Sequence, residues 1–181
     1  MVFETAATIN GFIASESNSL NWLFEVVSDE QPPVALGATV MVEGSTTYEW
    51  VLEHEDLLAQ PHKWAAYFGN KPTFVFTTRE LPVPAGADVR FVRGAVAAAL
   101  PAIREAAGEG DIWVVGGGEL AAQFLDAGAL DEISVSIAPA LLAGGAPLLP
   151  RSLGADRLRL RSATAVGQFA HLVYDVAPTT T

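Results

Sequence analysis

The strongest chemical signal in the sequence is a run of three glycines, Gly116-Gly117-Gly118. It follows an apolar segment, residues 112–115, that reads as a buried strand, and it precedes a predicted helix over residues 120–127. Because glycine has no side chain, an anion can approach the backbone closely, and the N–H groups at the start of a helix point toward the bound anion. The pattern predicts a phosphate cradle, although a tight turn without a ligand accounts for the same residues equally well.

Gly116, Gly118 and Ala121 also match the G-x-G-x-x-G/A pattern of Rossmann dinucleotide-binding units. A Rossmann unit places an acidic residue near the end of the next strand, where this chain has Ile137-Ala138-Pro139. Too little chain follows to complete that fold. We therefore exclude the Rossmann topology.

Three further segments place hydroxyl or cationic groups at or shortly after the ends of predicted strands. These residues are Ser45, Thr46 and Thr47, then Thr77, Thr78 and Arg79, and finally Arg93. Hydroxyls and guanidinium groups are suitable partners for phosphate oxygens. Ser45 can equally serve as the N-cap of a helix, and each arginine can be a solvated surface charge.

The elements that must position these groups alternate between strands and helices, and the chain ends in strands. Strands are predicted at residues 2–9, 12–14, 38–42, 72–77, 89–92, 112–115, 132–138, 157–165 and 169–176, and helices at 21–27, 45–58, 95–107 and 120–127. This order predicts an α/β fold with a mostly parallel twisted sheet, helices on both faces and an antiparallel C-terminal edge. We expect a single domain over residues 1–177 and a frayed tail at 178–181.

Composition limits the partners. Twenty-one acidic against ten basic residues give a net charge of −11, which disfavours nucleic acid and anionic membranes. No apolar run reaches the roughly 20 residues that span a bilayer. The chain has no cysteine, and its three histidines are too far apart for metal-ligand spacing, so we expect no metal site and a cytoplasmic location. Half of the residues are apolar, which suits a sheet buried on both faces or a subunit interface.

A family resemblance sharpens these expectations. Residues 114–125, VVGGGELAAQFL, resemble the glycine segment of the dihydrofolate-reductase-like superfamily. Residues 127–133 and 139–150 resemble its riboflavin-biosynthesis reductase branch, the RibD C-terminal domain, as do the opening Asn10-Gly11-Phe12-Ile13-Ala14 and Asn21-Trp22-Leu23. The resemblance implies that fold, a homodimer, and NADPH as the cofactor in preference to NADH.

The same resemblance assigns the cofactor site. It implies contacts from Ala6, Ile13, Gly44, Ser45, Thr46, Thr47, Thr77, Thr78, Arg79, Arg93, Val115, Gly116, Gly117, Gly118, Glu119 and Leu120. Arg79 falls where the family binds the adenosine 2′-phosphate, which favours NADPH. The chain departs from the family's Gly-Arg-x-Thr element because Ser45 replaces the arginine.

For the acceptor site the resemblance implies Asn10, Trp22, Tyr48 and Ser136. Trp22 and Tyr48 can also be ordinary core residues, which is the interpretation we favour for Phe24. Folate reductases carry a catalytic carboxylate five residues after the tryptophan, and this chain has Val27 there. Folate reduction is therefore not expected, and no catalytic residue is assigned.

The sequence thus predicts an NADPH-dependent reductase that transfers hydride to a small heterocyclic or carbonyl-type acceptor. The alternative is a nucleotide-binding or interaction module of the same fold that lacks turnover. The replaced arginine and the missing carboxylate favour this alternative. Binding of NADPH without its consumption would distinguish the alternative from the reductase.

Overall fold

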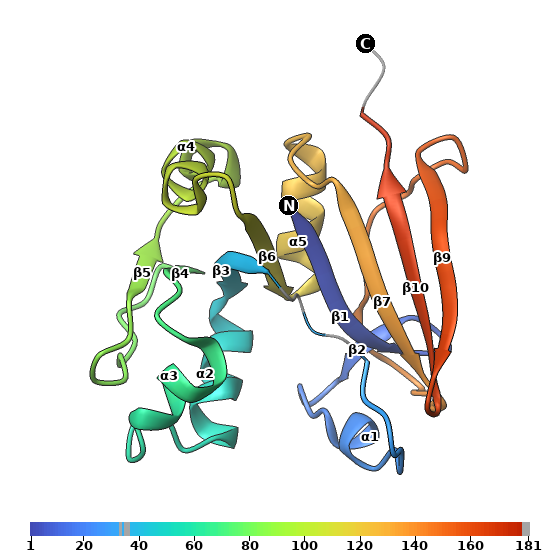
Figure 1. Ribbon diagram of the computed structural model, residues 1–181, viewed down its shortest axis with the longest axis horizontal. Helices are drawn as coiled ribbons and strands as arrows, with labels where there is room; N and C mark the ends of the chain where they lie inside the picture. Colours follow the sequence, from blue (N-terminus) through green and yellow to red (C-terminus); the bar gives the residue numbers. More distant parts are fainter. Residues whose placement is uncertain (33, 35–36, 179–181) are drawn as a thin grey trace. The chain divides into compact units, whose positions relative to one another are not determined.

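A computed structural model describes residues 1–32, 34 and 37–178 (Figure 1). The chain divides into two compact units: unit 1 comprises Met1–Leu36 and Gly117–Thr181, and unit 2 comprises Gly37–Gly116. The chain therefore passes from unit 2 to unit 1 inside the glycine run. Of the predicted frayed tail at 178–181, all but Pro178 lies outside the described residues. One domain over residues 1–177 stays a prediction.

Unit 2 contains four parallel strands in the order β5-β4-β3-β6. The strands are β3 (Ala38–Gly44), β4 (Thr73–Phe76), β5 (Val89–Val92) and β6 (Asp111–Gly116), and the helices are α2 (Ser45–His54), α3 (His62–Phe68) and α4 (Val96–Ala107). In Figure 1, α4 lies on the opposite side of these strands from α2 and α3.

The core of unit 2 on the α2–α3 side is built around aromatic residues. Tyr48, Leu52, Leu57, Trp64 and Val75 form one buried cluster, in which the rings of Tyr48 and Trp64 meet edge to face. Burial of such large apolar side chains is the main source of stability for this layer.

Unit 2 corrects two sequence predictions. Helix α2 ends at His54 rather than at residue 58, because Asp56 adopts a left-handed backbone with φ of 52°, which a helix cannot continue through. Helix α3 was not predicted. Its signals are present in the sequence: Trp64 and Phe68 are spaced four residues apart, and Gly69 follows the helix end with a positive φ.

Unit 1 contains the strands β1, β7, β10 and β9 in that order, with β1 parallel to β7 and the two C-terminal strands antiparallel. A separate antiparallel pair is formed by β2 and β8. The elements are β1 (Val2–Thr8), β2 (Phe12–Ser15), α1 (Asn21–Phe24), α5 (Gly118–Asp126), β7 (Glu132–Ala138), β8 (Gly145–Pro147), β9 (Leu158–Val166) and β10 (Phe169–Val176).

Two details of unit 1 differ from expectation. Helix α1 has four residues instead of reaching residue 27, and Phe24 is 56% exposed, so its assignment to the core was wrong. Strand β8 lies within the predicted loop 142–150, where three residues are too few to give a periodic signal.

The predicted fold class is confirmed: the strands are mostly parallel, and the C-terminal edge is antiparallel. No helix within residues 1–32, 34 and 37–178 combines the length and apolar character needed to cross a membrane.

Candidate functional site

The four parallel strands of unit 2 end in one row. Gly44 is in register with Phe76, and Phe76 is in register with Val92. On the other side, Glu43 is in register with Gly116. Because the predicted cofactor segments follow these strand ends, Ser45 to Thr47, Thr77 to Arg79 and Arg93 all begin at the same edge of the sheet. This carboxyl edge is where open α/β sheets bind ligands.

The turns that lead from strands into α2, α4 and α5 all leave the helix N-terminus without a side-chain cap among the described residues, and in α2 and α5 the N-cap is a glycine. The N-cap of α2 is Gly44, with φ of −83° and ψ of 160°, and no side chain caps that helix. Ser45 is the first helical residue, so the alternative assignment of Ser45 as the N-cap was wrong. The N-cap of α5 is Gly117, again without a side-chain cap. N–H groups at such helix starts can bond an anion.

The three glycines of the run have different surroundings. A Cβ on Gly116 would lie 3.1 Å from the Thr47 hydroxyl oxygen, so this glycine lets Thr47 come close. A Cβ on Gly118 would collide with the backbone carbonyl oxygens of Pro147 and Leu148. A Cβ on Gly117 would meet no atom within 4 Å. The open space and the uncapped helix at Gly117 fit a phosphate group.

Val115 and Leu120 flank the run but offer only backbone to a ligand. Val115 lies in β6 and is half-buried, and Leu120 is the third residue of α5 with a side chain 7% exposed. Their predicted contacts would have to come from their N–H and C=O groups.

Arg79 forms its hydrogen bonds with other residues of unit 2. Its backbone N–H donates to the Thr77 hydroxyl at 3.0 Å, and its guanidinium forms two hydrogen bonds to the Glu49 carboxylate. Both charged side chains are about half exposed, and Thr78 beside them is exposed. The sequence analysis missed Glu49. No signal in the sequence could have found it, because Glu49 and Arg79 are 30 positions apart.

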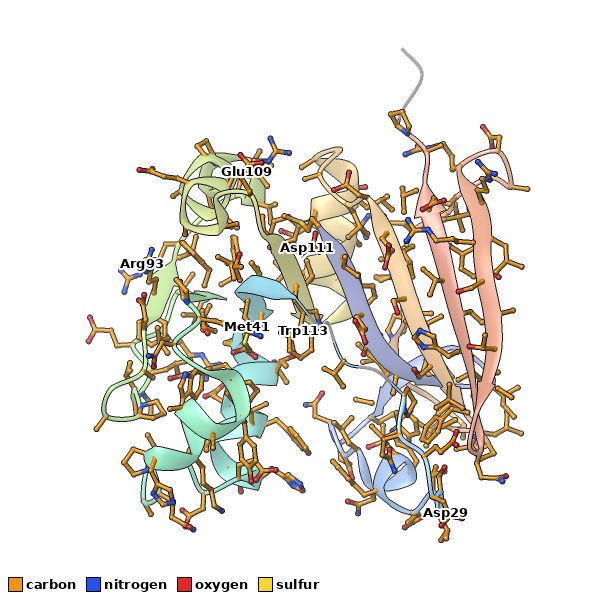
Figure 2. The ribbon with its side chains drawn as sticks, viewed as in Figure 1. Asp29, Met41, Arg93, Glu109, Asp111 and Trp113 are labelled. Atoms are coloured by element: carbon orange, nitrogen blue, oxygen red, sulfur yellow. The ribbon has the colours of Figure 1, made fainter. Side chains whose placement is uncertain are left out.

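Arg93 follows β5 and extends away from the strands into solvent (Figure 2). It forms no ion pair with a residue that the structure describes. Arg93 thus has a guanidinium available to an anion, although its exposure also suits a plain surface charge.

Glu119, in the first turn of α5, is paired with Arg151, a residue that the sequence analysis had not singled out. Arg151 donates to both carboxylate oxygens at 2.8 and 3.0 Å and to Asp126 at 2.9 Å. The hydrogen bonds from Arg151 hold the pKa of Glu119 below its ordinary value. The carboxylate of Glu119 is thereby kept ionised and held along the outer surface of the helix.

In unit 1, Asn10 ties the first loop to the segment after β7. The Asn10 amide oxygen accepts hydrogen bonds from the Thr8 hydroxyl at 2.9 Å and from the Leu142 N–H at 3.3 Å. Its amide nitrogen donates to the Leu142 carbonyl at 2.6 Å. Ala6 and Ile13, predicted to lie beside the nicotinamide, are both half-buried. Asn10 therefore positions the loop, and a substrate contact from it stays a prediction.

A pocket of about 620 Å³ lies beside Trp22. Its lining consists of Trp22, Glu25, Val26, Val27, residues 139–142 and Gln168. Trp22 is 8% exposed, packs with Ala138 and Phe169, and has an indole N–H without a hydrogen-bond partner among the described residues. The volume of this pocket is in the range of small-molecule binding sites. Of the predicted acceptor residues, Trp22 is the one that lines it.

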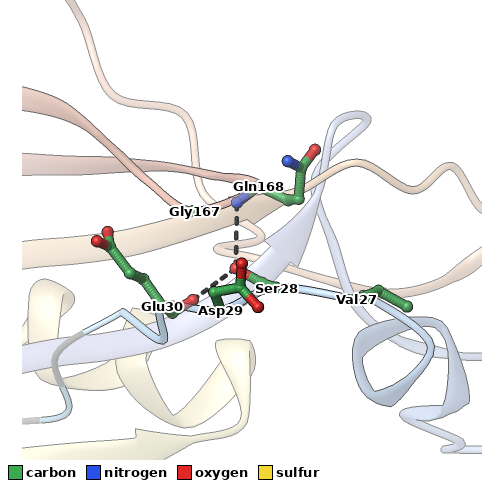
Figure 3. A pocket seen from close by; sticks show the side chains of 6 residues that line it. All are labelled: Val27, Ser28, Asp29, Glu30, Gly167 and Gln168. Atoms are coloured by element: carbon green, nitrogen blue, oxygen red, sulfur yellow. Dashed lines mark hydrogen bonds between the residues drawn. The ribbon is translucent and has the colours of Figure 1, made fainter.

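A second pocket, of about 340 Å³, shares Val27 and Gln168 with the first (Figure 3). Here the Ser28 hydroxyl donates to the Glu30 carbonyl at 2.6 Å and accepts from the Gln168 N–H at 3.3 Å. These bonds fasten the segment after α1 to the β9–β10 hairpin. Val27, at the position of the folate reductases' carboxylate, is 89% exposed.

The other two predicted acceptor residues are buried. The Ser136 hydroxyl on β7 is 3.0 Å from Nδ1 of His171, its cross-strand partner on β10, and both side chains are less than a tenth exposed. Tyr48 is fully buried, and its hydroxyl donates to the Pro82 carbonyl at 2.7 Å. Tyr48 has the surroundings of a core residue, and its role as an acceptor contact stays a prediction.

Glu43 is a buried acid that the sequence analysis did not consider. It is 2% exposed and shares its sheet face with its register partner Val75, which belongs to the Tyr48 cluster. Burial raises the pKa of Glu43 to about 8, so this carboxyl is mostly protonated at neutral pH. Burial, and then the nearby Glu43, raise the pKa of Tyr48.

Comparisons with known proteins bear on the fold of this chain. Residues 57–172 match the model of the RibD C-terminal domain. The uncharacterized protein YwjB of Bacillus subtilis (strain 168) is 25% identical over 176 residues, which are 96% of this chain and 95% of YwjB. A candidate riboflavin biosynthesis protein from Shewanella sp. PV-4 has a crystal structure that superposes with a TM-score of 0.74 at 24% identity, covering 97% of this chain and 98% of that one.

A crystal structure from Thermotoga maritima shows the same fold inside a longer protein. It is a diaminohydroxyphosphoribosylaminopyrimidine deaminase/5-amino-6-(5-phosphoribosylamino)uracil reductase, with a TM-score of 0.64 at 14% identity. The match covers 97% of this chain and 56% of that protein.

Proposed function

Because the chain belongs to the RibD C-terminal domain family, we propose that it is an NADPH-dependent reductase of a small heterocyclic or carbonyl-type acceptor. Reductase domains of this family are generally NADPH-dependent. The observation that carries the proposal is the row of strand ends in unit 2, because Thr47, Arg79 and Gly116 all follow or lie in that row.

The phosphate groups of the cofactor have counterparts among the residues of each unit. In unit 1, backbone N–H groups at Gly117 and the start of α5 can bind phosphate, and in unit 2 the hydroxyls of Ser45, Thr46 and Thr47 can bind phosphate oxygens. Arg79 binds the 2′-phosphate, with Arg93 as a second cation. The bound dihydronicotinamide supplies the hydride.

The acceptor is placed in the pocket beside Trp22. Val26, Val27 and Leu142 offer apolar surface to a bound ring. Val27 cannot donate a proton, which sets this chain apart from folate reductases. Any proton that the acceptor requires comes from a group other than a carboxylate at this position.

Calorimetric titration with NADPH tests the first half of the proposal. We expect saturable heat with NADPH and weaker binding of NADH, followed by loss of NADPH absorbance when an acceptor is added. The second half is tested with a panel of heterocyclic and carbonyl acceptors. Absence of binding by both reduced and oxidised nicotinamide dinucleotides would contradict the reductase assignment.

A second candidate function is a nucleotide-binding module without turnover. Three observations favour it: Ser45 replaces the family's arginine, Glu49 neutralises Arg79, and exposed Val27 replaces an acid. Saturable NADPH binding with no consumption across the whole acceptor panel would select this function.

We also propose that the chain forms a homodimer. Strand β9 presents apolar side chains to solvent: Leu160 is 53% exposed, and Ala163 and Ala165 are exposed beside it. Burial of such a surface against a second copy would be favourable. Sedimentation equilibrium is expected to give twice the 19.0 kDa chain mass, and Leu160→Lys is expected to lower it. A monomer at all concentrations would contradict the dimer.

A further inference from the structure

The pocket beside Trp22 combines an apolar wall with an acidic rim. Val26, Val27, Leu141 and Leu142 supply apolar surface, and Glu25 supplies a carboxylate at the edge. The second pocket, which shares Val27 and Gln168 with it, adds Asp29 and Glu30 (Figure 3). Among the described residues, no lysine, arginine or histidine lines either pocket.

The charges on this rim are not compensated. Glu25, Asp29 and Glu30 are exposed, and none of them forms an ion pair with a residue in the described part of the chain. Figure 2 shows Asp29 at the surface, away from the strands. Glu25 on the first pocket, and Asp29 and Glu30 on the adjoining second pocket, create a negative potential, which the overall charge of −11 reinforces.

Gln168 is the neutral polar group of the lining. Its backbone N–H is already bonded to Ser28, and its side-chain amide belongs to both pockets. An amide can donate to or accept from an uncharged polar substituent. The pocket therefore offers apolar contact, one amide and negative charge, and none of its described lining residues carries a positive charge.

From these contacts we propose that the pocket takes an apolar ring with an uncharged or basic substituent, and that it rejects acceptors carrying a phosphate. This inference rests on the proposed function, because it takes the pocket as the acceptor site. Its physical basis is repulsion between a phosphate dianion and the carboxylates of the rim, which acts over the Debye length of about 8 Å at physiological salt.

Riboflavin and riboflavin 5′-phosphate are a matched pair of probes, because they differ only in the phosphate group. We expect riboflavin to bind the unmodified protein about tenfold more tightly than its phosphate, with a difference that shrinks as salt is added. In the double variant Glu25→Lys/Asp29→Lys we expect the two affinities to become equal or to reverse. Flavin fluorescence titration measures both.

The control is the double variant Glu105→Lys/Glu109→Lys, which changes net charge by the same amount at two exposed positions in and just after α4. We expect the preference for riboflavin to be unchanged in this control. A second pair of single variants, Leu141→Ala and Gln168→Ala, is expected to weaken riboflavin binding several-fold, since both exposed side chains line the pocket.

Two kinds of result would overturn the inference. The first is riboflavin 5′-phosphate binding as tightly as riboflavin, or failure of both probes to bind. The second is riboflavin binding that Leu141→Ala and Gln168→Ala leave unaffected. NADPH calorimetry on the same samples separates the failures: intact NADPH binding with either result rejects the pocket assignment alone, whereas loss of NADPH binding rejects the proposed function.

Discussion

Arg79 and Glu49 form a two-bond ion pair between the loop after β4 and the second turn of α2. Nη1 of Arg79 donates to Oε1 of Glu49 at 2.8 Å, and Nη2 donates to Oε2. The guanidinium proposed to recognise the 2′-phosphate therefore already has an anionic partner. A cofactor phosphate must compete with Glu49 or bind beside it, which lowers the advantage of NADPH over NADH.

Glu49→Gln is expected to increase NADPH affinity by roughly two- to fivefold and to leave NADH affinity almost unchanged, the size expected for an exposed ion pair. Arg79→Ala should lower the ratio of NADPH affinity to NADH affinity, whereas Glu49→Gln should raise this ratio. Titration of both nucleotides by calorimetry measures it. Glu53→Gln, an exposed acid one helical turn further along α2, is the control and should not alter the ratio. Equal changes for NADPH and NADH would contradict the assignment of Arg79.

Glu43 is expected to make the stability of the protein fall as pH rises. Its folded pKa of about 8 lies above the value of 4.5 for a free carboxyl. The unfolded chain therefore releases the proton first, and the free energy of unfolding decreases by roughly 1 kcal/mol per pH unit between these two values. Glu43→Gln should remove this slope and stabilise the protein at pH 8.

Urea denaturation at several pH values measures that slope, with the exposed Glu53→Gln as the control that retains it. If Glu43→Gln showed the same decrease between pH 5 and pH 8 as the unmodified protein, burial of an acid at this position would not be its source.

Gly117 and Gly118 should respond differently to the same substitution. Gly118→Ala is expected to cost about 1–3 kcal/mol of stability, because the new methyl group collides with the carbonyl oxygens of Pro147 and Leu148. Gly117→Ala meets no atom and has an ordinary extended backbone, so it should fold normally. It should nevertheless weaken NADPH binding, since its methyl group occupies space proposed for phosphate. Thermal unfolding and calorimetry separate the two effects; unchanged NADPH affinity in Gly117→Ala would count against the cradle.

Asn10→Ala removes the hydrogen bonds that fasten Leu142 to the first loop. We expect a loss of roughly 1 kcal/mol in stability and faster amide hydrogen exchange at residues 140–142. Hydrogen exchange with mass spectrometry measures this. Asn70→Ala, at an exposed position in unit 2, is the comparison. Exchange at 140–142 that matched the unmodified protein would show that Asn10 does not hold this wall of the pocket.

Much of the fold could be predicted because its signals are local. The apolar segments that became β3, β6 and β7 are bounded by glycine or proline, and alternation of strands and helices implies parallel pairing. The glycine run marked the turn before α5 for the same reason. The same reasoning could have predicted helix α3 from the spacing of Trp64 and Phe68 and from Gly69 at the helix end.

Pairings between distant residues could not be predicted. Arg79 and Glu49 are 30 positions apart, and Ser136 and His171 are 35 apart. Sequence spacing says nothing about such contacts until the register of the strands and the packing of the helices are known. The same holds for Glu43, whose neighbours come from β4 and α2.

The sequence by itself therefore determined the fold class, the positions of glycine, hydroxyl and arginine residues after the strands and the absence of an acid at position 27, because residue identity and local periodicity encode them. Only the tertiary structure decided that Arg79 is already paired, that Tyr48 is buried, that Gly117 is the open glycine and that Trp22 borders an acidic pocket. Those properties depend on which side chains meet in space, and chain order does not specify that.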